Sequence, residues 1–416
     1  MRTRAFAWAL LACCAAAPAF AQATGQDAAA TAPSFRLRGS IKGSALLLRT
    51  PDAPEVFPAR TGAESLWRAR FEPEVRAGRT RLSLAYEQRL RVASGAAGFT
   101  TVGILPSQAV PPFRLRALDW SLSQSSGSSW RHEIDRANAQ VSFARGELTI
   151  GRQAVGWGRG VLFGAVDLFA PFSPLEADRE WRRGVDAVHG ELELSDRSSV
   201  DVVGAFGQSW DRSVVAARVR GFAGPIDVEA MGGRRARDLF GGLTSSAAIG
   251  DAALHGEVAA FRLPGGQPGG DGRVVWKAVA GGSFRVPVGK GVLTYVEYHY
   301  SGFGAARPDD IPRLLADPAF AERYLRGDTQ ILSRHALAVL GSYETSPELS
   351  FTGQWLHNPA DRSGVLAPTV TVTLSDQLSV IAAVYAPYGA RPRGTTLRSE
   401  YGTAPLSGFL QLRTYF

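Results

Sequence analysis

Apolar and polar side chains alternate along most of the chain from Ser34 to Phe416. In the stretch "LWRARFEPEVRAG", apolar residues such as Trp67 and Phe71 occupy alternate positions, with charged residues such as Arg68 between them. A period of two places successive side chains on opposite faces of a strand. Similar runs recur up to the terminal "GFLQLRTYF". The pattern predicts an all-β chain whose strands each have an apolar and a polar face.

The alternating runs are too long and too charged for a soluble β-sandwich, which is the main alternative. They span about 9 to 13 residues, as membrane-crossing strands do, whereas strands of soluble proteins average about 5 or 6. A sandwich core would not bury the charges on the polar face. Aromatic residues lie near the ends of the runs, where a membrane barrel has its interfacial girdles. They are Trp67, Trp276, Tyr298, Tyr300, Trp355, Tyr385, Tyr388, Tyr415 and Phe416. We therefore expect a transmembrane antiparallel up-and-down β-barrel.

Short and long connections alternate between the runs, as they do in outer-membrane barrels. The short turns, rich in Gly, Pro, Asp and Ser, are expected at 76–80, 144–147, 194–199, 222–225, 250–253, 287–291, 345–348 and 374–377. The other connections are 50–63, 92–130, 156–182, 208–211, 232–238, 262–272, 301–330, 358–364 and 389–404. This count predicts about eighteen strands, with sixteen as the alternative, around an aqueous lumen unless loops plug it.

Two of these connections have a character of their own. The Ser-, Gly- and Pro-rich connection 92–130 predicts a mobile surface loop. The stretch "DIPRLLADPAFAERYLRG" at 310–327 predicts the one helix outside the N-terminal segment, interrupted at Pro318.

The first 21 residues predict a secretory signal peptide, because Arg2 and Arg4 precede an apolar run that ends in small residues. Cleavage after Ala21 would leave a short periplasmic linker at 22–33 and a barrel at 34–416 in the outer membrane. The stretch "LLAC" also fits a lipoprotein signal with an acylated Cys13. Both cysteines lie in this segment, so cleavage after Ala21 leaves no thiol or disulfide in the mature chain. No later apolar run reaches the roughly 18 residues of a membrane helix.

Arginine supplies nearly all of the positive charge. The chain has 46 Lys and Arg against 38 Asp and Glu, and its lysines are Lys42, Lys277 and Lys290. Arginine binds carboxylates and phosphates through directed hydrogen bonds, which would suit anionic solutes or the anionic outer leaflet. A GC-rich genome would give the same bias, and composition leaves both explanations open.

The connection 156–182 combines apolar, aromatic and charged residues and has no period of two. We expect it to fold into the barrel and to narrow the pore with its charges, because rings of charged side chains set the selectivity of pores. The constriction candidates are Asp167, Glu176, Asp178, Arg179, Glu180, Arg182 and Arg183, and the lumen-wall candidates are Arg68, Arg70, Arg81 and Arg152. The alternative is a solvated outer loop whose charges pair with each other or with lipopolysaccharide.

The same stretch carries a family resemblance. "GRQ", then "WG", then an acidic residue and a proline, then "RRGVDAV" returning into a strand, resembles bacterial outer-membrane porin-like barrels of the alginate-export and related families. The resemblance covers about a tenth of the chain. It implies a wide monomeric barrel, with an arginine-rich lumen in the alginate exporters.

Catalytic and cofactor motifs are absent from the sequence. There is no G-x-S-x-G elbow, no zinc-ligand spacing and no phosphate-binding loop, and the six histidines lie on different predicted strands. Glu297 and His299 would share one face of a strand, which most simply predicts a wall pair. We therefore expect no enzyme activity, no cofactor, no metal and no nucleic-acid partner.

The chain ends on an alternating strand with a terminal aromatic residue. Such an end resembles the assembly signal of outer-membrane barrels, here Leu410, Leu412 and Phe416, and implies the barrel-assembly machinery, outer-membrane lipid and lipopolysaccharide as partners. The predicted function is a channel for the diffusion or export of polar solutes or oligosaccharides, with anionic ones favoured, through an arginine-rich lumen narrowed by the 156–182 loop. The alternative is a non-transport barrel that displays its loops as a receptor, adhesin or assembly partner.

Overall fold

The computed structural model describes residues 32–96, 103–105, 111–265 and 272–416. The predicted signal peptide, Cys13 and most of the linker lie outside these residues. Among the described residues, no helix has the length and apolar character needed to cross a bilayer.

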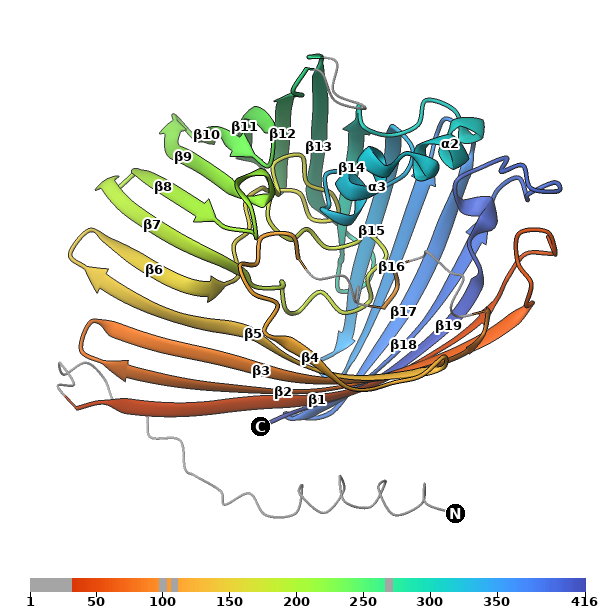
Figure 1. Ribbon diagram of the computed structural model, residues 1–416, viewed down its shortest axis with the longest axis horizontal. Helices are drawn as coiled ribbons and strands as arrows, with labels where there is room; N and C mark the ends of the chain where they lie inside the picture. Colours follow the sequence, from red (N-terminus) through yellow and green to blue (C-terminus); the bar gives the residue numbers. More distant parts are fainter. Residues whose placement is uncertain (1–31, 97–102, 106–110, 266–271) are drawn as a thin grey trace.

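Nineteen strands form one antiparallel sheet, and eighteen of them close into a barrel (Figure 1). The strands are β1 (Ser34–Arg49), β2 (Thr61–Ala77), β3 (Thr80–Gly95), β4 (Asp119–Gln124), β5 (Ser128–Phe143), β6 (Gly146–Gln153), β7 (Val185–Ser195), β8 (Ser198–Ala205), β9 (Val214–Ala223), β10 (Ile226–Arg235), β11 (Asp238–Ile249), β12 (Ala252–Arg262), β13 (Val274–Val286), β14 (Val292–Ser301), β15 (His335–Ser346), β16 (Leu349–Asn358), β17 (Ser363–Ser375), β18 (Leu378–Tyr388) and β19 (Leu406–Tyr415). The short β4 pairs only with the outer part of β5, while β3 also pairs with β5. The expected count of about eighteen wall strands is confirmed.

The barrel wall is apolar outside and polar inside. On β2, Trp67 is 53% exposed, whereas its neighbour Arg68 is 6% exposed and Arg70 is 1% exposed. On β19, Leu410 and Leu412 are likewise exposed, while Gln411 between them is buried. Exposed leucine, valine and tryptophan side chains recur on most strands, so the outer surface suits a lipid environment. The alternation of apolar and polar residues in the sequence therefore corresponds to the outer and inner faces of a membrane barrel.

The connections follow the expected alternation of short and long, with two exceptions. The outer connection between β16 and β17 has only the four residues 359–362. All eight predicted short turns occur, each between two strands at the same end of the barrel. That end is periplasmic by the convention of this architecture. Residues 232–238 were expected to form an outer loop, but only Ala236 and Arg237 separate β10 from β11. The two strands stay paired up to Arg235 and Asp238, and Ala236 takes a left-handed φ of 53° to make the turn.

The connection 92–130 is not simply a surface loop, which corrects the sequence-based expectation. It contains β4, and its residues Phe113 and Arg114 are buried inside the barrel. Its Ser- and Gly-rich tip suggested mobility, but the apolar and basic residues before the tip have partners in the lumen.

The expected helix is present as two short pieces, α2 (Ile311–Ala316) and α3 (Pro318–Leu325). Pro318 lacks an N–H group, and the residue before it, Asp317, is extended with ψ of 114° and caps α3. Within the described residues the outer connections also contain the 3₁₀ turns η3 (Trp210–Arg212), η4 (Pro308–Asp310) and η5 (Tyr401–Thr403).

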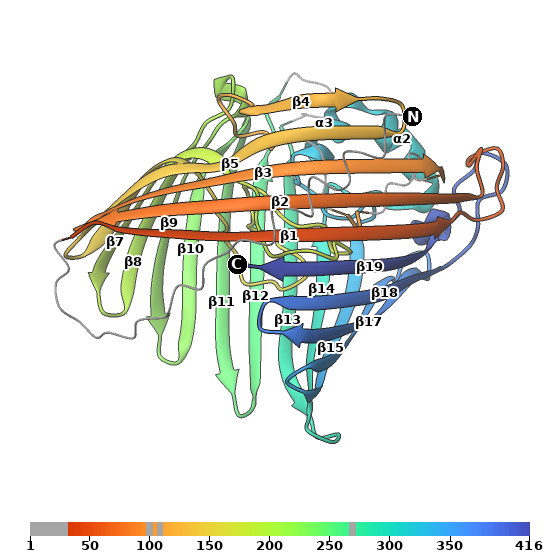
Figure 2. The same cartoon turned by 90° about the horizontal axis from the view of Figure 1, so that it is seen from below.

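The barrel closes where β19 pairs with β1, from Ser40 opposite Tyr415 to Arg49 opposite Leu406 (Figure 2). Across this seam Gln411 donates a side-chain hydrogen bond to Ser44 at 2.8 Å. Phe416 continues the ladder, because its N–H and C=O both bond to Gly39. A side chain at Gly39 would collide with the Phe416 ring, which lies 6.0 Å from the ring of Phe71.

Deletion of Phe416 is expected to impair insertion of the barrel while leaving export intact. The deletion removes two backbone hydrogen bonds and an aromatic contact at the seam, together with the proposed assembly signal. The measurement is the amount of heat-modifiable barrel in the outer-membrane fraction. Phe416→Tyr, which keeps the ring and the backbone, serves as the control and should insert normally. Equal insertion of the deletion variant would refute the role of the terminal residue.

Candidate functional site

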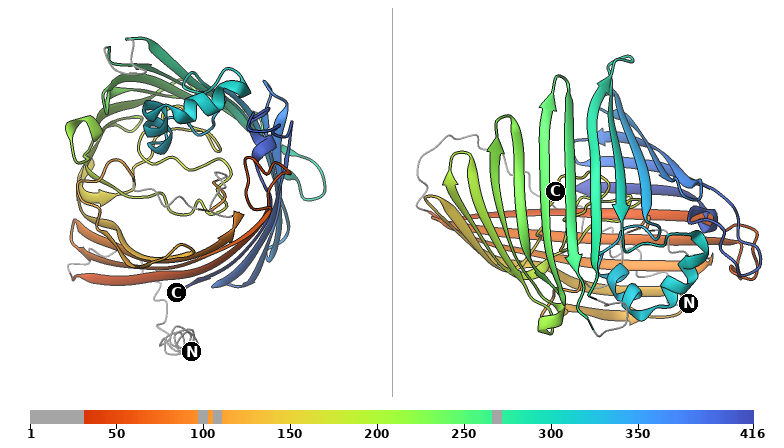
Figure 3. Two further views of the ribbon diagram at one scale, coloured as in Figure 1. Left: turned by 45° about the vertical axis from the view of Figure 1, so that its right-hand side comes forward. Right: turned by 90° about the horizontal axis from the view of Figure 1, so that it is seen from above.

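Residues 154–184, which we call the inner loop, run through the interior of the barrel (Figure 3). Its aromatic residues Trp157, Phe163 and Phe169 are buried, and the rings of Trp157 and Phe169 meet edge to face at 5.4 Å. Phe113 from the connection before β4 packs against Phe169 at 6.5 Å. The apolar part of the inner loop thus builds a small core inside the lumen instead of facing water.

Two wall carboxylates hold the backbone of this apolar part. Glu257 on β12 and Glu297 on β14 are both buried. Glu257 accepts hydrogen bonds from the N–H groups of residues 159, 160, 165 and 166. Glu297 accepts hydrogen bonds from those of residues 161, 162 and 163, at N···O distances of 2.5 to 3.1 Å. Buried N–H groups need an acceptor, and a carboxylate offers several lone pairs. These bonds supply acceptors for seven backbone N–H groups of a segment that has no regular secondary structure.

The expected pairing of Glu297 with His299 is wrong. Glu297 bonds instead to Nε2 of His255 at 2.9 Å. His299 is buried and stacks on Phe163 at 4.9 Å, and both of its ring nitrogens lack a hydrogen-bond partner within the described part of the chain.

The charged end of the inner loop meets the wall formed by β1, β2, β3 and β5. Lys42 on β1 bonds to Asp178 at 2.8 Å and to Glu180 at 2.6 Å. Arg68 on β2 bridges Asp178 at 3.3 Å and Glu87 on β3 at 2.9 Å. The loop is therefore tied to the wall by ion pairs at this end and by backbone hydrogen bonds at the other.

The ion pairs extend along the wall as one connected network, which we call the lumen network. Glu133 on β5 pairs with Arg183 of the inner loop at 3.0 Å, with Arg89 at 3.1 Å and with Arg114 at 2.5 Å. The members, joined by successive pairs within 4.0 Å, are the cations Lys42, Arg68, Arg70, Arg89, Arg114, Arg136, Arg183 and Arg413 and the carboxylates Glu72, Glu87, Glu133, Asp135, Asp178 and Glu180.

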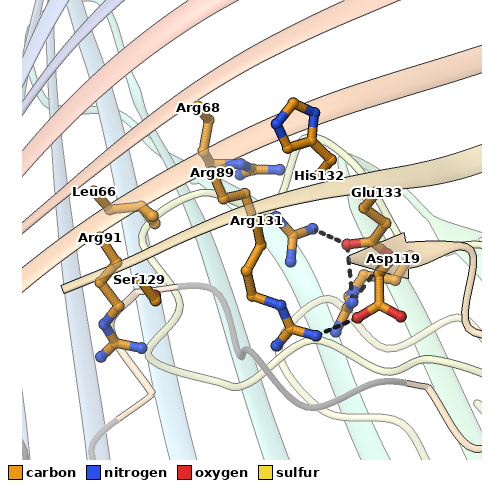
Figure 4. A pocket seen from close by; sticks show the side chains of 10 residues that line it. Leu66, Arg68, Arg89, Arg91, Asp119, Ser129, Arg131, His132 and Glu133 are labelled. Carbon is orange, nitrogen blue, oxygen red and sulfur yellow. Dashed lines mark hydrogen bonds and ion pairs between the residues drawn. The ribbon is translucent and has the colours of Figure 1, made fainter. Parts of the chain in front are cut away.

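A small cavity of about 20 Å³ opens within the network, lined by Arg68, Arg89, Arg131 and Glu133 among others (Figure 4). That volume is enough for about one water molecule. Most of the arginine charge here faces a carboxylate, so the wall alternates in sign.

Trp181 is the aromatic member of this region. Its ring lies 3.8 Å from Nζ of Lys42, and the guanidinium carbons of Arg70 and Arg68 lie 5.0 and 5.4 Å from it. Three cations around one indole ring give cation–π attraction in addition to the ion pairs.

The sequence-predicted candidates divide into three groups. Asp178, Glu180 and Arg183 from the loop and Arg68 and Arg70 from the wall belong to the lumen network. The other four loop residues hold the loop itself: Asp167 pairs with Arg182 at 2.5 Å, Arg179 donates to the backbone oxygen of Ser173 at 3.1 Å, and Glu176 accepts from Ser173 N–H at 3.3 Å.

The two remaining wall candidates lie away from the network. Arg152 on β6 is buried and pairs with Asp186 at 2.6 Å and with the backbone oxygen of Ile134 at 2.9 Å, which anchors the base of the inner loop. Arg81 is the second residue of β3 and lies at the periplasmic end.

Burial raises the pKa values of the loop carboxyl groups, and neighbouring cations lower them. Burial raises the pKa of Glu176 to about 7, and the nearby Arg179 only partly offsets it. Burial also raises the pKa of Asp178, but Arg68 and Lys42 outweigh burial and hold it below its ordinary value. Asp178 is therefore an anion in the network at neutral pH, while Glu176 titrates near neutrality.

Several residues of this region were missed by the sequence-based prediction. Lys42, Glu87 and Glu133 stand at inward positions of the period-two pattern, which was a usable signal. Arg114 and Trp181 lie in irregular segments where no periodicity indicates direction.

Glu257→Gln is expected to loosen the apolar part of the inner loop. The amide nitrogen of glutamine cannot accept, so at least one pair of loop N–H groups loses its acceptor, at about 1–3 kcal/mol for each buried group. Hydrogen exchange followed by mass spectrometry should show faster exchange in 159–166. Glu191→Gln on β7, whose carboxylate accepts no bond from the inner loop among the described residues, is the matched control. Unchanged exchange in Glu257→Gln would mean that apolar packing alone holds the loop.

The fold matches solved porins, although no protein-family model and no curated protein matches the sequence. A BenF-like porin from Pseudomonas fluorescens Pf-5 aligns with a TM-score of 0.53 at 8% identity, over 92% of this chain and 98% of that chain. OccK7 (OpdD) of Pseudomonas aeruginosa gives 0.52 and OccAB4 of Acinetobacter baumannii gives 0.50, each at 10% identity over 92% of this chain and 98% of the other. The likeness to alginate exporters stays a prediction. The chain is therefore an antiparallel β-barrel with the porin fold.

Proposed function

We propose that this barrel is an outer-membrane channel for polar solutes, with a modest preference for anions. The observation that carries the proposal is the lumen network, which lines the place where the inner loop meets β1, β2, β3 and β5. A wall of fixed, alternating charges can exchange hydrogen bonds with a hydrated solute without holding it tightly, which conduction requires.

The direction of the preference follows from the charge balance. The network contains eight cations and six carboxylates, so its formal surplus is two positive charges. Carboxylates neutralise most of the arginines, so the lumen differs from a bare arginine ladder. In a confined lumen a small surplus still raises the local concentration of anions.

The alternative is a barrel that does not transport and presents its outer loops to a partner. The buried apolar core of the inner loop favours this alternative, because it fills part of the lumen.

Planar-bilayer recording separates the two functions. Steady single-channel conductance supports the channel, and a reconstituted barrel that never conducts overturns it. Contacts with lipopolysaccharide and the assembly machinery stay predictions, as does the absence of catalysis.

Opposite charge changes within the network are expected to shift ion selectivity in opposite directions. Glu180→Gln removes a partner of Lys42 and should raise the anion-to-cation permeability ratio by about twofold, whereas Arg183→Gln should lower it similarly. The measurement is the reversal potential under a potassium chloride gradient. Asp196→Asn, an exposed change in the turn between β7 and β8, controls for net charge and should leave the ratio unchanged. Equal ratios in all three variants would refute the role of the network.

A further inference from the structure

A second cavity lies among the outer connections, apart from the lumen network. Its volume is about 220 Å³. Its walls come from the connection after β1, the inner loop, the segment carrying α2 and α3, and the connection before β19. For comparison, a cavity of roughly 150 Å³ holds a benzene molecule. The space is therefore large enough for one aromatic ring with a short side chain.

Apolar residues form more than half of the lining, and the polar ones are Ser173, Tyr324, Gln330, Glu400, Tyr401 and Thr403. Phe57, Leu175, Ile311, Ile331 and Leu356 are buried residues of its wall. This composition matches small-molecule sites, which are mostly apolar with a few polar groups that fix orientation.

Among the described residues that line the cavity, Glu400 is the only charged one. Its carboxylate accepts the N–H of Leu332 at 2.8 Å and the side-chain amide of Asn358 at 3.1 Å. Ser333 also donates to it, and all of these donors are neutral. Within the described part of the chain, no arginine, lysine or histidine forms an ion pair with it. Burial is the main cause that raises the pKa of Glu400 to about 7. The carboxyl is thus a half-buried group without a charged partner among the described residues, and it is an anion above about pH 7.

The other titratable groups around Glu400 do not supply that counter-charge. Asp361 accepts the N–H of Glu400 at 2.6 Å and brings a second negative charge. The phenols of Tyr324 on α3 and Tyr401 on η5 are neutral and form part of the cavity wall. Their faces suit a cation, because aromatic rings attract positive charge.

We propose that this cavity binds a small organic cation, an ammonium group attached to a compact apolar body. The ammonium would pair with Glu400, and the apolar body would lie against the leucine and isoleucine wall. This site is opposite in sign to the lumen network, and it does not depend on whether the barrel conducts. A bound cation would also contact the inner loop, because Ser173, Pro174 and Leu175 belong to the same wall.

Binding of phenethylammonium to the detergent-solubilised full barrel tests the proposal by titration calorimetry. Phenylacetate, of similar size and opposite charge, is the ligand control. We expect saturable binding of phenethylammonium at pH 8 and none of phenylacetate. Glu400→Gln should weaken binding at least tenfold, whereas Asp376→Asn, which removes an exposed carboxylate in the turn between β17 and β18, should not. Equal binding of the two ligands, or unchanged binding by Glu400→Gln, would overturn the proposal.

Two further measurements test whether misfolding, and not the loss of the carboxylate, explains weaker binding by Glu400→Gln. Leu315→Trp fills the cavity without altering Glu400 and should also abolish binding while the barrel keeps its heat-modifiable migration. Lowering the pH from 8 to 6 protonates Glu400, whose pKa is raised to about 7, and should weaken binding about tenfold while the ligand stays charged. That pH dependence should vanish in Glu400→Gln. Binding that is insensitive to both changes would mean that the ligand lies elsewhere.

Discussion

The organisation of the barrel interior depends on two wall carboxylates that accept the backbone N–H groups of the inner loop. A strand satisfies its backbone through its neighbours, but an irregular segment inside a barrel has no such ladder. Glu257 and Glu297 replace the ladder for seven consecutive or nearly consecutive donors. This arrangement allows a loop with an apolar core to stay in the lumen. The charged end of the loop is then held against one side of the wall.

The lumen network follows from that placement. Asp178 and Glu180 reach Lys42 from a loop that is also anchored at β12 and β14. Once there, the loop carboxylates relieve the repulsion among closely spaced cations on β1 and β2. Buried ion pairs of this kind add little net stability, because desolvation offsets their attraction. Their contribution is to fix positions, so each charge in the pore has a defined place.

The sequence predicted the wall much better than the interior. Strand alternation gave the inward positions of Arg68 and Arg70 and the eight periplasmic turns, because both depend on neighbours along the chain. It failed at Ala236, where two strands continue their pairing into a tight turn that no Gly or Pro marks. It also failed for Arg114 and Trp181, whose partners depend on how irregular segments fold against distant strands. The hydrogen bonds of Glu257 to the inner loop join residues more than ninety positions apart, and neither composition nor periodicity predicts such contacts.

The seam between β1 and β19 has a consequence for the order of folding. The hydrogen bond from Gln411 to Ser44 joins residues 367 positions apart, so this contact requires almost the entire chain to be present. Every other wall strand pairs with strands close to it in the chain and can form early, whereas closure brings together the first and last strands. Contacts of such long range form slowly. Until they form, the molecule is an open sheet with two unpaired edges. This state is the most prone to aggregation and has the greatest need of a chaperone.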